Sequence, residues 1–156
     1  MFAQILKTGQ KIIWGDNETP ITLNSFYNYP GSIRKEMGLF LEMSIQDNAT
    51  ISSLDDYVRF GLINSKSERD KVEGYIKEFH IKTTDPDKKV VNLSGGNQQK
   101  VVLARSTSTL PKLIILDEPT RGVEVGAKSE TYKLMYQLAS QGVGILMISS
   151  ELSEVL

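Results

Sequence analysis

Two runs of consecutive apolar residues mark the last third of the chain, at residues 113–116 and 145–148. Uninterrupted apolar runs of this length are typical of parallel strands that are buried on both faces of a sheet. One helix is expected to begin after residues 94–96 and to end before Pro111, and another to span about residues 126–140. The alternation of helices with buried strands predicts an α/β fold that contains part of a parallel sheet.

The middle of the chain has a helical pattern from about residue 48 to residue 82. Apolar residues recur there at spacings of three and four in two runs, which are Leu54, Tyr57, Val58 and Leu62, then Val72, Tyr75, Ile76 and Phe79. The polar residues 67–70 are expected to start the second helix, and residues 85–89 resemble a linker. The pattern predicts a small helical subdomain of two or three helices.

The first segment of the chain predicts a β-hairpin. Residues 11–14 are rich in β-forming side chains, and residues 15–17 supply a turn before the apolar Ile21 and Leu23. Residues 24–44 combine aromatic side chains, a Pro-Gly turn and a charged run, and they fit neither pattern clearly.

Composition narrows the chemistry that the chain can perform. It has 156 residues, of which 18 are Lys or Arg and 19 are Asp or Glu, so the net charge is −1 and nucleic acid is not an expected partner. The absence of cysteine excludes disulfides, thiolate metal sites and a cysteine nucleophile, and His80 is the single histidine. Carboxylates, hydroxyls, backbone amides and a hard metal such as Mg²⁺ remain. With no apolar run long enough for a signal or a membrane span, we expect a soluble, cytoplasmic chain.

The first candidate site is the helix start at Ser94, Gly95 and Gly96. The first backbone N–H groups of a helix have no intrahelical acceptor, and the helix dipole adds positive potential there, so this start can bind an anion or a phosphate. The alternative is that Ser94 is only an N-cap, which Ser-Gly-Gly taken alone would favour.

The second candidate site is the acid pair Asp117 and Glu118, which follows a buried strand and precedes Pro119. Ligands of open α/β sheets bind at the carboxyl ends of the strands. Asp117 can hold Mg²⁺ through water, while Glu118 can orient and deprotonate an attacking water. The alternative is a pair of solvated loop charges.

Together these motifs resemble the signature motif and the Walker B strand of ABC-type ATPases. The segments concerned are residues 93–100 and 113–120, and residues 120–128 and 148–151 extend the similarity. Asn97 stands where most of the superfamily has glutamine. Together with residues 120–128 and 148–151, the signature that contains Asn97 resembles the carbohydrate-import branch of ribose, galactose and xylose type, specifically its second ATP-binding half. The resemblance is tight over residues 91–156 and looser over residues 38–54.

The resemblance implies roles for individual residues. Residues of the signature would cover the γ-phosphate of an ATP held by a second nucleotide-binding domain, namely Leu93, Ser94, Gly95, Gly96, Asn97 and Gln98. Asp117 would be the Mg²⁺ ligand and Glu118 the catalytic base. Glu124 stands at the D-loop acid, usually aspartate, and Ser150 stands at the switch histidine, where a serine cannot relay a proton.

The implied fold is an incomplete P-loop NTPase domain of the ABC ATPase type. No Gly-x-x-x-x-Gly-Lys-Ser/Thr loop occurs in the sequence, and the similar string at residues 122–129 is interpreted as the D-loop and a helix start. We therefore expect the chain to begin just after its own phosphate loop. The expected parts are residues 1–45 as a hairpin and antiparallel edge, 46–90 as the helical subdomain, and 91–156 as the signature helix and core.

The function implied is that of a partial ATP-binding and ATP-hydrolysing subunit of a monosaccharide importer, with ATP and Mg²⁺ as cofactors. The expected partners are a second nucleotide-binding domain, membrane permease subunits and, indirectly, a sugar-binding protein, with the chain at the inner face of the cell membrane. An alternative is a non-catalytic module whose signature completes a partner's ATP site. A chromosome-maintenance ATPase is disfavoured by Asn97 and by the absence of coiled-coil flanks or a basic stripe. The sequence does not identify the sugar.

Overall fold

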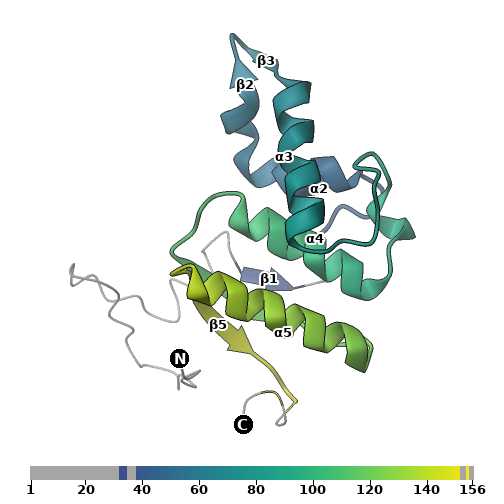
Figure 1. Cartoon of the computed structure of the whole chain (residues 1–156), viewed down its shortest axis with the longest axis vertical. Coiled ribbons are helices and arrows are strands. Elements are labelled where there is room, and N and C mark those ends of the chain that lie inside the picture. Colours follow the sequence, from purple (N-terminus) through teal and green to yellow (C-terminus); the bar gives the residue numbers. More distant parts are fainter. Residues whose placement is uncertain (1–31, 35–37, 152–153, 155–156) are drawn as a thin grey trace, which may run out of the picture.

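The structure of the chain is a computed structural model that describes residues 32–34, 38–151 and 154 (Figure 1). The hairpin expected over residues 11–23 lies outside the described residues. Three parallel strands form one sheet in the order β1 (Ser32–Arg34), β4 (Leu113–Asp117) and β5 (Gly144–Ile148). The two apolar runs are parallel strands, as predicted, and they are neighbours, with Asp117 paired to Ile148 at their carboxyl ends. The expected burial holds for the centre of β4, but β5 is only partly buried and Ile148 is exposed.

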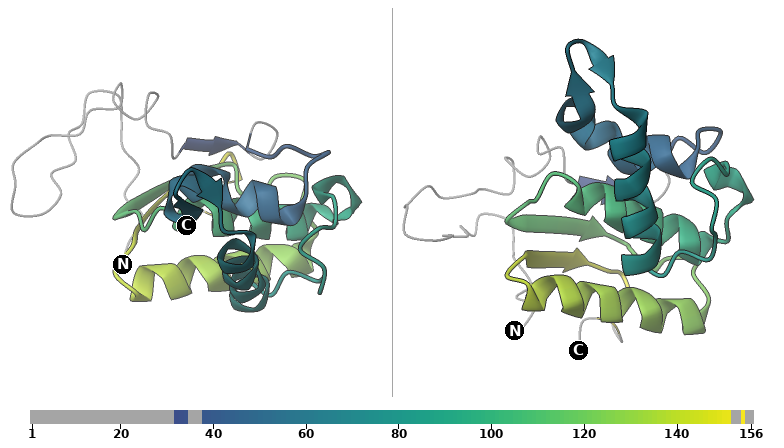
Figure 2. Two further views of the ribbon diagram at one scale, coloured as in Figure 1. Left: turned by 90° about the horizontal axis from the view of Figure 1, so that it is seen from above. Right: turned by 45° about the horizontal axis from the view of Figure 1, so that its top comes forward.

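Helices α4 (Gly95–Thr107) and α5 (Val125–Ser140) precede and follow β4, where the sequence predicted them. Figure 2 shows α5 running alongside β5. Gly142, with φ of +92°, follows the end of α5, and this left-handed conformation ends the helix before β5. Leu134, Met135 and Leu138 bury the inner side of α5.

The middle of the chain contains more kinds of element than the predicted helices. It folds as α2 (Ile45–Thr50), the 3-10 helix η1 (Ile51–Tyr57), the strands β2 (Val58–Arg59) and β3 (Leu62–Ile63), and α3 (Ser65–Glu78). A short 3-10 helix, η2 (Val90–Asn92), then leads to α4.

The prediction of a helix through Val58 and Leu62 was wrong, because the chain turns there in an antiparallel hairpin. Arg59 pairs with Leu62, which leaves a two-residue turn of Phe60 and Gly61 at φ of +52° and +78°. Positive φ at both turn residues is the requirement of a type I′ hairpin. The hairpin projects from the body of the molecule (Figure 1), and its apolar side chains are exposed.

Side-chain caps fix where the two α-helices of this part begin. In α2, Ser44 and Asp47 form a reciprocal capping box. In α3, the side chain of Asn64 accepts a hydrogen bond from the N–H of Ser67 at 3.1 Å. The second helix therefore starts two residues earlier than predicted, and its apolar run does pack inward, at Val72, Tyr75, Ile76 and Phe79.

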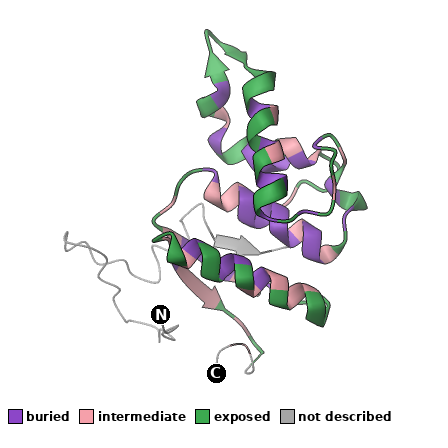
Figure 3. Cartoon of the chain, in the orientation of Figure 1, coloured by how far each residue is buried: buried purple, intermediate pink, exposed green. Residues whose placement is uncertain are grey.

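One apolar core joins the helices of the middle part to the sheet and its helices. Its largest fully buried apolar side chains are Ile45, Val72, Phe79, Val90, Val101, Leu103, Ile114 and Leu116. Figure 3 shows buried residues along α4 and on one side of α5, whereas the hairpin is exposed. The boundaries of the three-part division of the chain stay a prediction.

Arg105, in the last turn of α4, connects the segment after β1 to η1. Its guanidinium donates to the carbonyl of Gly38 at 2.6 Å and to Ser52 Oγ at 3.0 Å, and it lies 5.8 Å from the ring centre of Phe40. Desolvation lowers its pKa. Among the described residues, no helix is long and apolar enough to cross a membrane.

Candidate functional site

The start of α4 leaves a set of backbone donors open. Ser94 occupies the N-cap position, but its hydroxyl accepts from the side-chain amide of Asn97 at 2.8 Å and caps no backbone N–H. Asn97 in turn accepts from the N–H of Lys82 at 2.9 Å. In the part of the chain that the structure describes, the N–H groups of Gly95, Gly96 and Asn97 donate no hydrogen bond. They are therefore available to an anion, and the reading of Ser94 as a side-chain N-cap does not hold.

Gly96 lies against α5 rather than at the surface. A Cβ atom on Gly96 would lie 2.8 Å from Cβ of Ala127 and 3.8 Å from Cγ1 of Val123. This close approach requires a glycine, since real Cβ contacts are longer. The packing sets the open N–H groups beside the loop that connects β4 to α5.

Two other signature residues support this turn from within. Leu93 is buried, and the side-chain amide of Gln98 donates to the carbonyls of Val90 and Leu93 at 3.2 and 3.3 Å. These bonds hold the segment that enters α4, so the two residues shape the turn from the protein side.

The acid pair follows β4, and the structure gives its two members different surroundings. Asp117 is the last residue of β4, half-buried between β1 and β5 in the sheet register. Glu118 has φ of +50°, a left-handed conformation that is strained for a side chain of this kind. Its N–H donates to the carbonyl of Ile148 at 2.8 Å, which fixes the backbone in this conformation.

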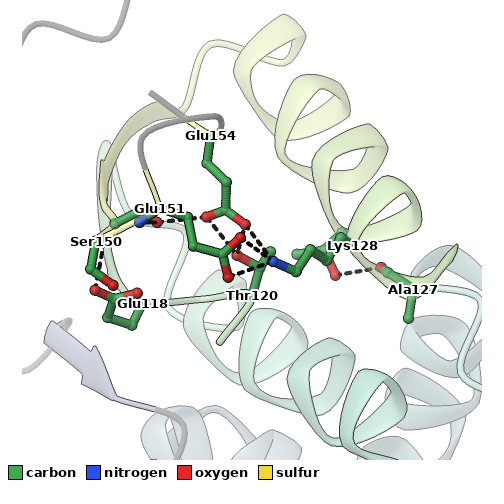
Figure 4. A network of polar contacts seen from close by, with 9 residues as sticks. Glu118, Thr120, Ala127, Lys128, Ser150, Glu151 and Glu154 are labelled. Atoms are coloured by element: carbon green, nitrogen blue, oxygen red, sulfur yellow. Dashed lines mark hydrogen bonds and ion pairs between the residues drawn. The ribbon is translucent and has the colours of Figure 1, made fainter. Parts of the chain in front are cut away.

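Glu118 points its carboxylate at the end of the neighbouring strand. Its Oε1 accepts a hydrogen bond from the backbone N–H of Ser150 at 2.7 Å (Figure 4). Ser150 is exposed, and its contact with the acid is made by the main chain rather than by the side chain. A strained, half-buried and hydrogen-bonded acid does not fit the alternative of a freely solvated loop charge.

Glu124 lies apart from these contacts. It is the exposed N-cap of α5, and its carbonyl accepts from the N–H groups of Ala127 and Lys128 at 2.9 and 3.0 Å. Within the described ranges its side chain makes no hydrogen bond or ion pair. The structure thus brings together Glu118 and Ser150, and it leaves the side chain of Glu124 open.

The sequence analysis missed a polar network next to the acid pair (Figure 4). Glu154 accepts from Thr120 at 2.7 Å, from Ser149 at 2.6 Å and from Lys128 at 3.0 Å, and Lys128 also pairs with Glu151 at 2.6 Å. Burial alone would raise the pKa of Glu154, but the hydrogen bonds outweigh it and hold the pKa at about 2. The bonds from Glu151 and Glu154 raise the pKa of Lys128. The sequence signal that could have indicated this network is that polar residues follow both of the predicted strands, Thr120 after the first and Ser149 after the second.

Lys100 is a second residue that the sequence analysis did not single out. Its side chain is 2% exposed, and its ammonium donates to Glu130 on α5 at 2.6 Å and to the carbonyl of His80 at 2.9 Å. The bonds from Lys100 lower the pKa of Glu130. His80 itself is exposed and has φ of +51°, just after the end of α3.

The residues present fit a magnesium–phosphate complex better than a metal held by protein alone. Among the described residues, no three acidic, histidine or cysteine side chains gather to hold an ion. Mg²⁺ bound to a nucleotide needs only one or two carboxylates, since phosphate and water oxygens complete its octahedron. Asp117, at the carboxyl end of a parallel strand, is suited to that part.

The strand order, the acids at the strand ends and the open helix start define the fold of an ATP-binding cassette. The structure is similar to a dimeric bacterial ABC transporter cassette, with a TM-score of 0.64 and 21% identity over 79% of this chain and 53% of that one. It is also similar to a dimeric cassette in a post-hydrolysis state bound to ADP and Pi, with a TM-score of 0.63 and 19% identity over the same shares.

Residues 2–121 match the sequence model of the ABC transporter family, and the chain belongs to this family. It is 53% identical over 123 residues to the ribose import ATP-binding protein of Geobacillus kaustophilus, covering 79% of this chain and 25% of that protein. It is 44% identical to the protein of the same name from Caldanaerobacter subterraneus, covering 100% of this chain and 33% of the relative. The chain thus spans a quarter to a third of the length of these relatives.

Proposed function

We propose that the chain is part of the ATP-binding subunit of an ABC importer that couples ATP hydrolysis to the uptake of a monosaccharide of the ribose type. The observation that supports this most is the placement of Glu118, a strained acid after β4 that is oriented by the N–H of Ser150. It belongs to a chain of the ABC transporter family, and the relatives at 44% and 53% identity are named for ribose import.

The open N–H groups at the start of α4 serve one ATP site and the acid pair serves another. Ser94, Gly95, Gly96 and Asn97 bind γ-phosphate oxygens of an ATP that a second nucleotide-binding domain holds, with the positive end of the α4 dipole directed at the anion. Leu93 and Gln98 keep this turn in place, and Glu124 of the D-loop faces the same partner domain.

At its own nucleotide, the chain contributes a metal ligand and a base. Asp117 would hold Mg²⁺, which when bound would neutralise charge on the phosphates. Glu118 accepts the proton of a water whose oxygen bonds to the γ-phosphorus as the bond to the ADP oxygen breaks. The N–H of Ser150 orients the carboxylate of Glu118 for this step.

The proposed partners follow from this role. They are a second nucleotide-binding domain, membrane permease subunits and, through these, a sugar-binding protein outside the membrane. We place the chain in the cytoplasm, peripherally on the inner face of the cell membrane. The importer relatives support this placement.

The test uses a ribose importer in which this chain replaces the matching segment of the Caldanaerobacter subterraneus relative, so that a phosphate loop precedes it. We expect Glu118→Gln to slow ATP hydrolysis by orders of magnitude while ATP binding persists, because the variant removes only the proton acceptor. Unchanged hydrolysis in Glu118→Gln would overturn the base role. If Glu118→Gln left hydrolysis unchanged while Gly95→Glu abolished it, the chain would be the non-catalytic module that completes a partner's site.

A further inference from the structure

The turn that follows β5 is held in place by side chains on both of its sides. Ser149 Oγ donates to Glu154 at 2.6 Å and accepts from the N–H of Glu151 at 3.1 Å. The carboxylate of Glu151 binds Lys128 of α5 at 2.6 Å. Ser150, the residue that binds Glu118, lies between these two anchored positions.

Glu154 is the point at which the anchors meet. Its side chain is 4% exposed, and its two oxygens accept from Thr120 Oγ1 at 2.7 and 2.8 Å. Thr120 is itself 1% exposed, and Lys128 lies 3.0 Å away. With its pKa near 2, Glu154 is an anion at neutral pH, and a buried anion with three hydrogen-bonding partners is a strong and directional anchor.

The partners of Glu154 lie close in sequence to the two residues that form the contact between Glu118 and Ser150. Thr120 follows Glu118 by two residues, and Ser149 directly precedes Ser150. Glu154 therefore links the two segments whose direct contact is the hydrogen bond from Ser150 to Glu118 (Figure 4). The contact does not depend on which side chain stands at position 150, because its donor is the backbone N–H.

We propose that Glu154 is a positioning residue: through Thr120 and Ser149 it holds the N–H of Ser150 against the carboxylate of Glu118. The proposal rests on the proposed function, in which Glu118 is the base. Lys128 supports the same arrangement by neutralising Glu154 and by fixing Glu151 from α5.

The first experiment measures amide hydrogen exchange of Ser150 by NMR in the 156-residue chain, without nucleotide. Removal of charge-assisted hydrogen bonds of this kind should speed exchange at Ser150 in Glu154→Gln by about tenfold or more. The amides of Leu116 and Leu146, inside β4 and β5, report the stability of the sheet and should change much less. Glu154→Asp keeps the charge on a shorter side chain, so its exchange rate at Ser150 should lie between those of the original chain and Glu154→Gln. If Glu154→Gln does not fold, Glu154→Asp replaces it as the test variant.

The matched control is Glu130→Gln, which also removes an acid paired with a lysine of low exposure but lies outside the network. It should leave the ratio of exchange at Ser150 to that at Leu116 unchanged. If Glu154→Gln left Ser150 protected, or if it accelerated all three reporter amides by the same factor, Glu154 would be structural only and the proposal would be wrong.

The second readout is kinetic and uses the chimaeric importer described above. Glu154→Gln should lower kcat and leave the KM for ATP within about twofold, because the base is misplaced while nucleotide contacts remain. An unchanged kcat would overturn the proposal. If the chimaera without further substitution did not hydrolyse ATP, the proposed function would fail, and the exchange experiment would still decide whether Glu154 positions Ser150.

Discussion

Gly96 in the first turn of α4 packs against Ala127 in the first turn of α5, so closely that a Cβ atom on Gly96 would lie 2.8 Å from that of Ala127. The backbone at the start of α4 therefore lies directly against the side chain of Ala127 at the start of α5. This contact holds the open N–H groups at the start of α4 next to the loop of residues 118–124.

The first prediction concerns that contact. Gly96→Ala should lower the free energy of unfolding by about 1–3 kcal/mol, because neither helix backbone can yield without losing other packing. Gly126→Ala is the matched control, since its added Cβ would meet nothing within 4 Å, and it should stabilise α5 by up to about 1 kcal/mol. Urea unfolding measures both, and a Gly96→Ala variant as stable as the original chain would show that α4 and α5 can separate freely.

The second prediction separates the side chain of Ser150 from its backbone. Because the N–H rather than the hydroxyl binds Glu118, Ser150→Ala should keep hydrolysis in the chimaeric importer within about twofold of the original. The control is Glu118→Gln under the same conditions, for which a large loss is expected. A comparable loss in Ser150→Ala would show that the hydroxyl takes part in the reaction.

The third prediction concerns the pH dependence of stability. Folding lowers the pKa of Glu154 from its ordinary 4.5 to about 2, so its ionised form stabilises the folded state. This contribution is fully present above about pH 4.5 and is lost as the pH falls towards 2. The difference in unfolding free energy between the original chain and Glu154→Gln should therefore shrink between pH 7 and pH 3. Urea unfolding across this range tests it, and a difference that stayed constant or grew would contradict the assigned pKa.

The fourth prediction concerns the β2–β3 hairpin. Phe60 is fully exposed at 104% and has φ of +52°, so it has neither packing nor a favourable backbone conformation. Phe60→Asn should stabilise the chain by about 0.5–1 kcal/mol, because asparagine followed by glycine is preferred in type I′ turns. Gly61→Ala, at φ of +78°, should destabilise it. Thermal unfolding distinguishes the two, and a loss of stability in Phe60→Asn would indicate that Phe60 has a contact in solution that favours it.

The sequence predicted the elements whose pattern is local and unambiguous. The strands β4 and β5 were recognised because each is a continuous apolar run, and α4 and α5 because Pro111 and Gly142 limit them. The hairpin at residues 58–63 was missed because the spacing of Tyr57, Val58 and Leu62 imitates a helix. The two-residue turn depends on the conformation of Phe60 and Gly61, which apolar spacing does not report.

The candidate site was predictable in part for a related reason. Asp117 and Glu118 stand at the end of a recognisable strand, and Ser94 to Gly96 stand at the start of a recognisable helix. The contacts that orient them join distant positions, such as Ser150 with Glu118 and Glu154 with Thr120, which lie 32 and 34 residues apart. Such pairs depend on the lateral order and register of the strands, and a pattern along the chain contains neither.

The ammonium of Lys100 has one further consequence. From within α4, it donates both to Glu130 of α5 and to the carbonyl of His80, which lies just after the end of α3. Sliding α4 past α5 or past the end of α3 would leave the buried ammonium of Lys100 without these partners, so its two bonds oppose such a displacement.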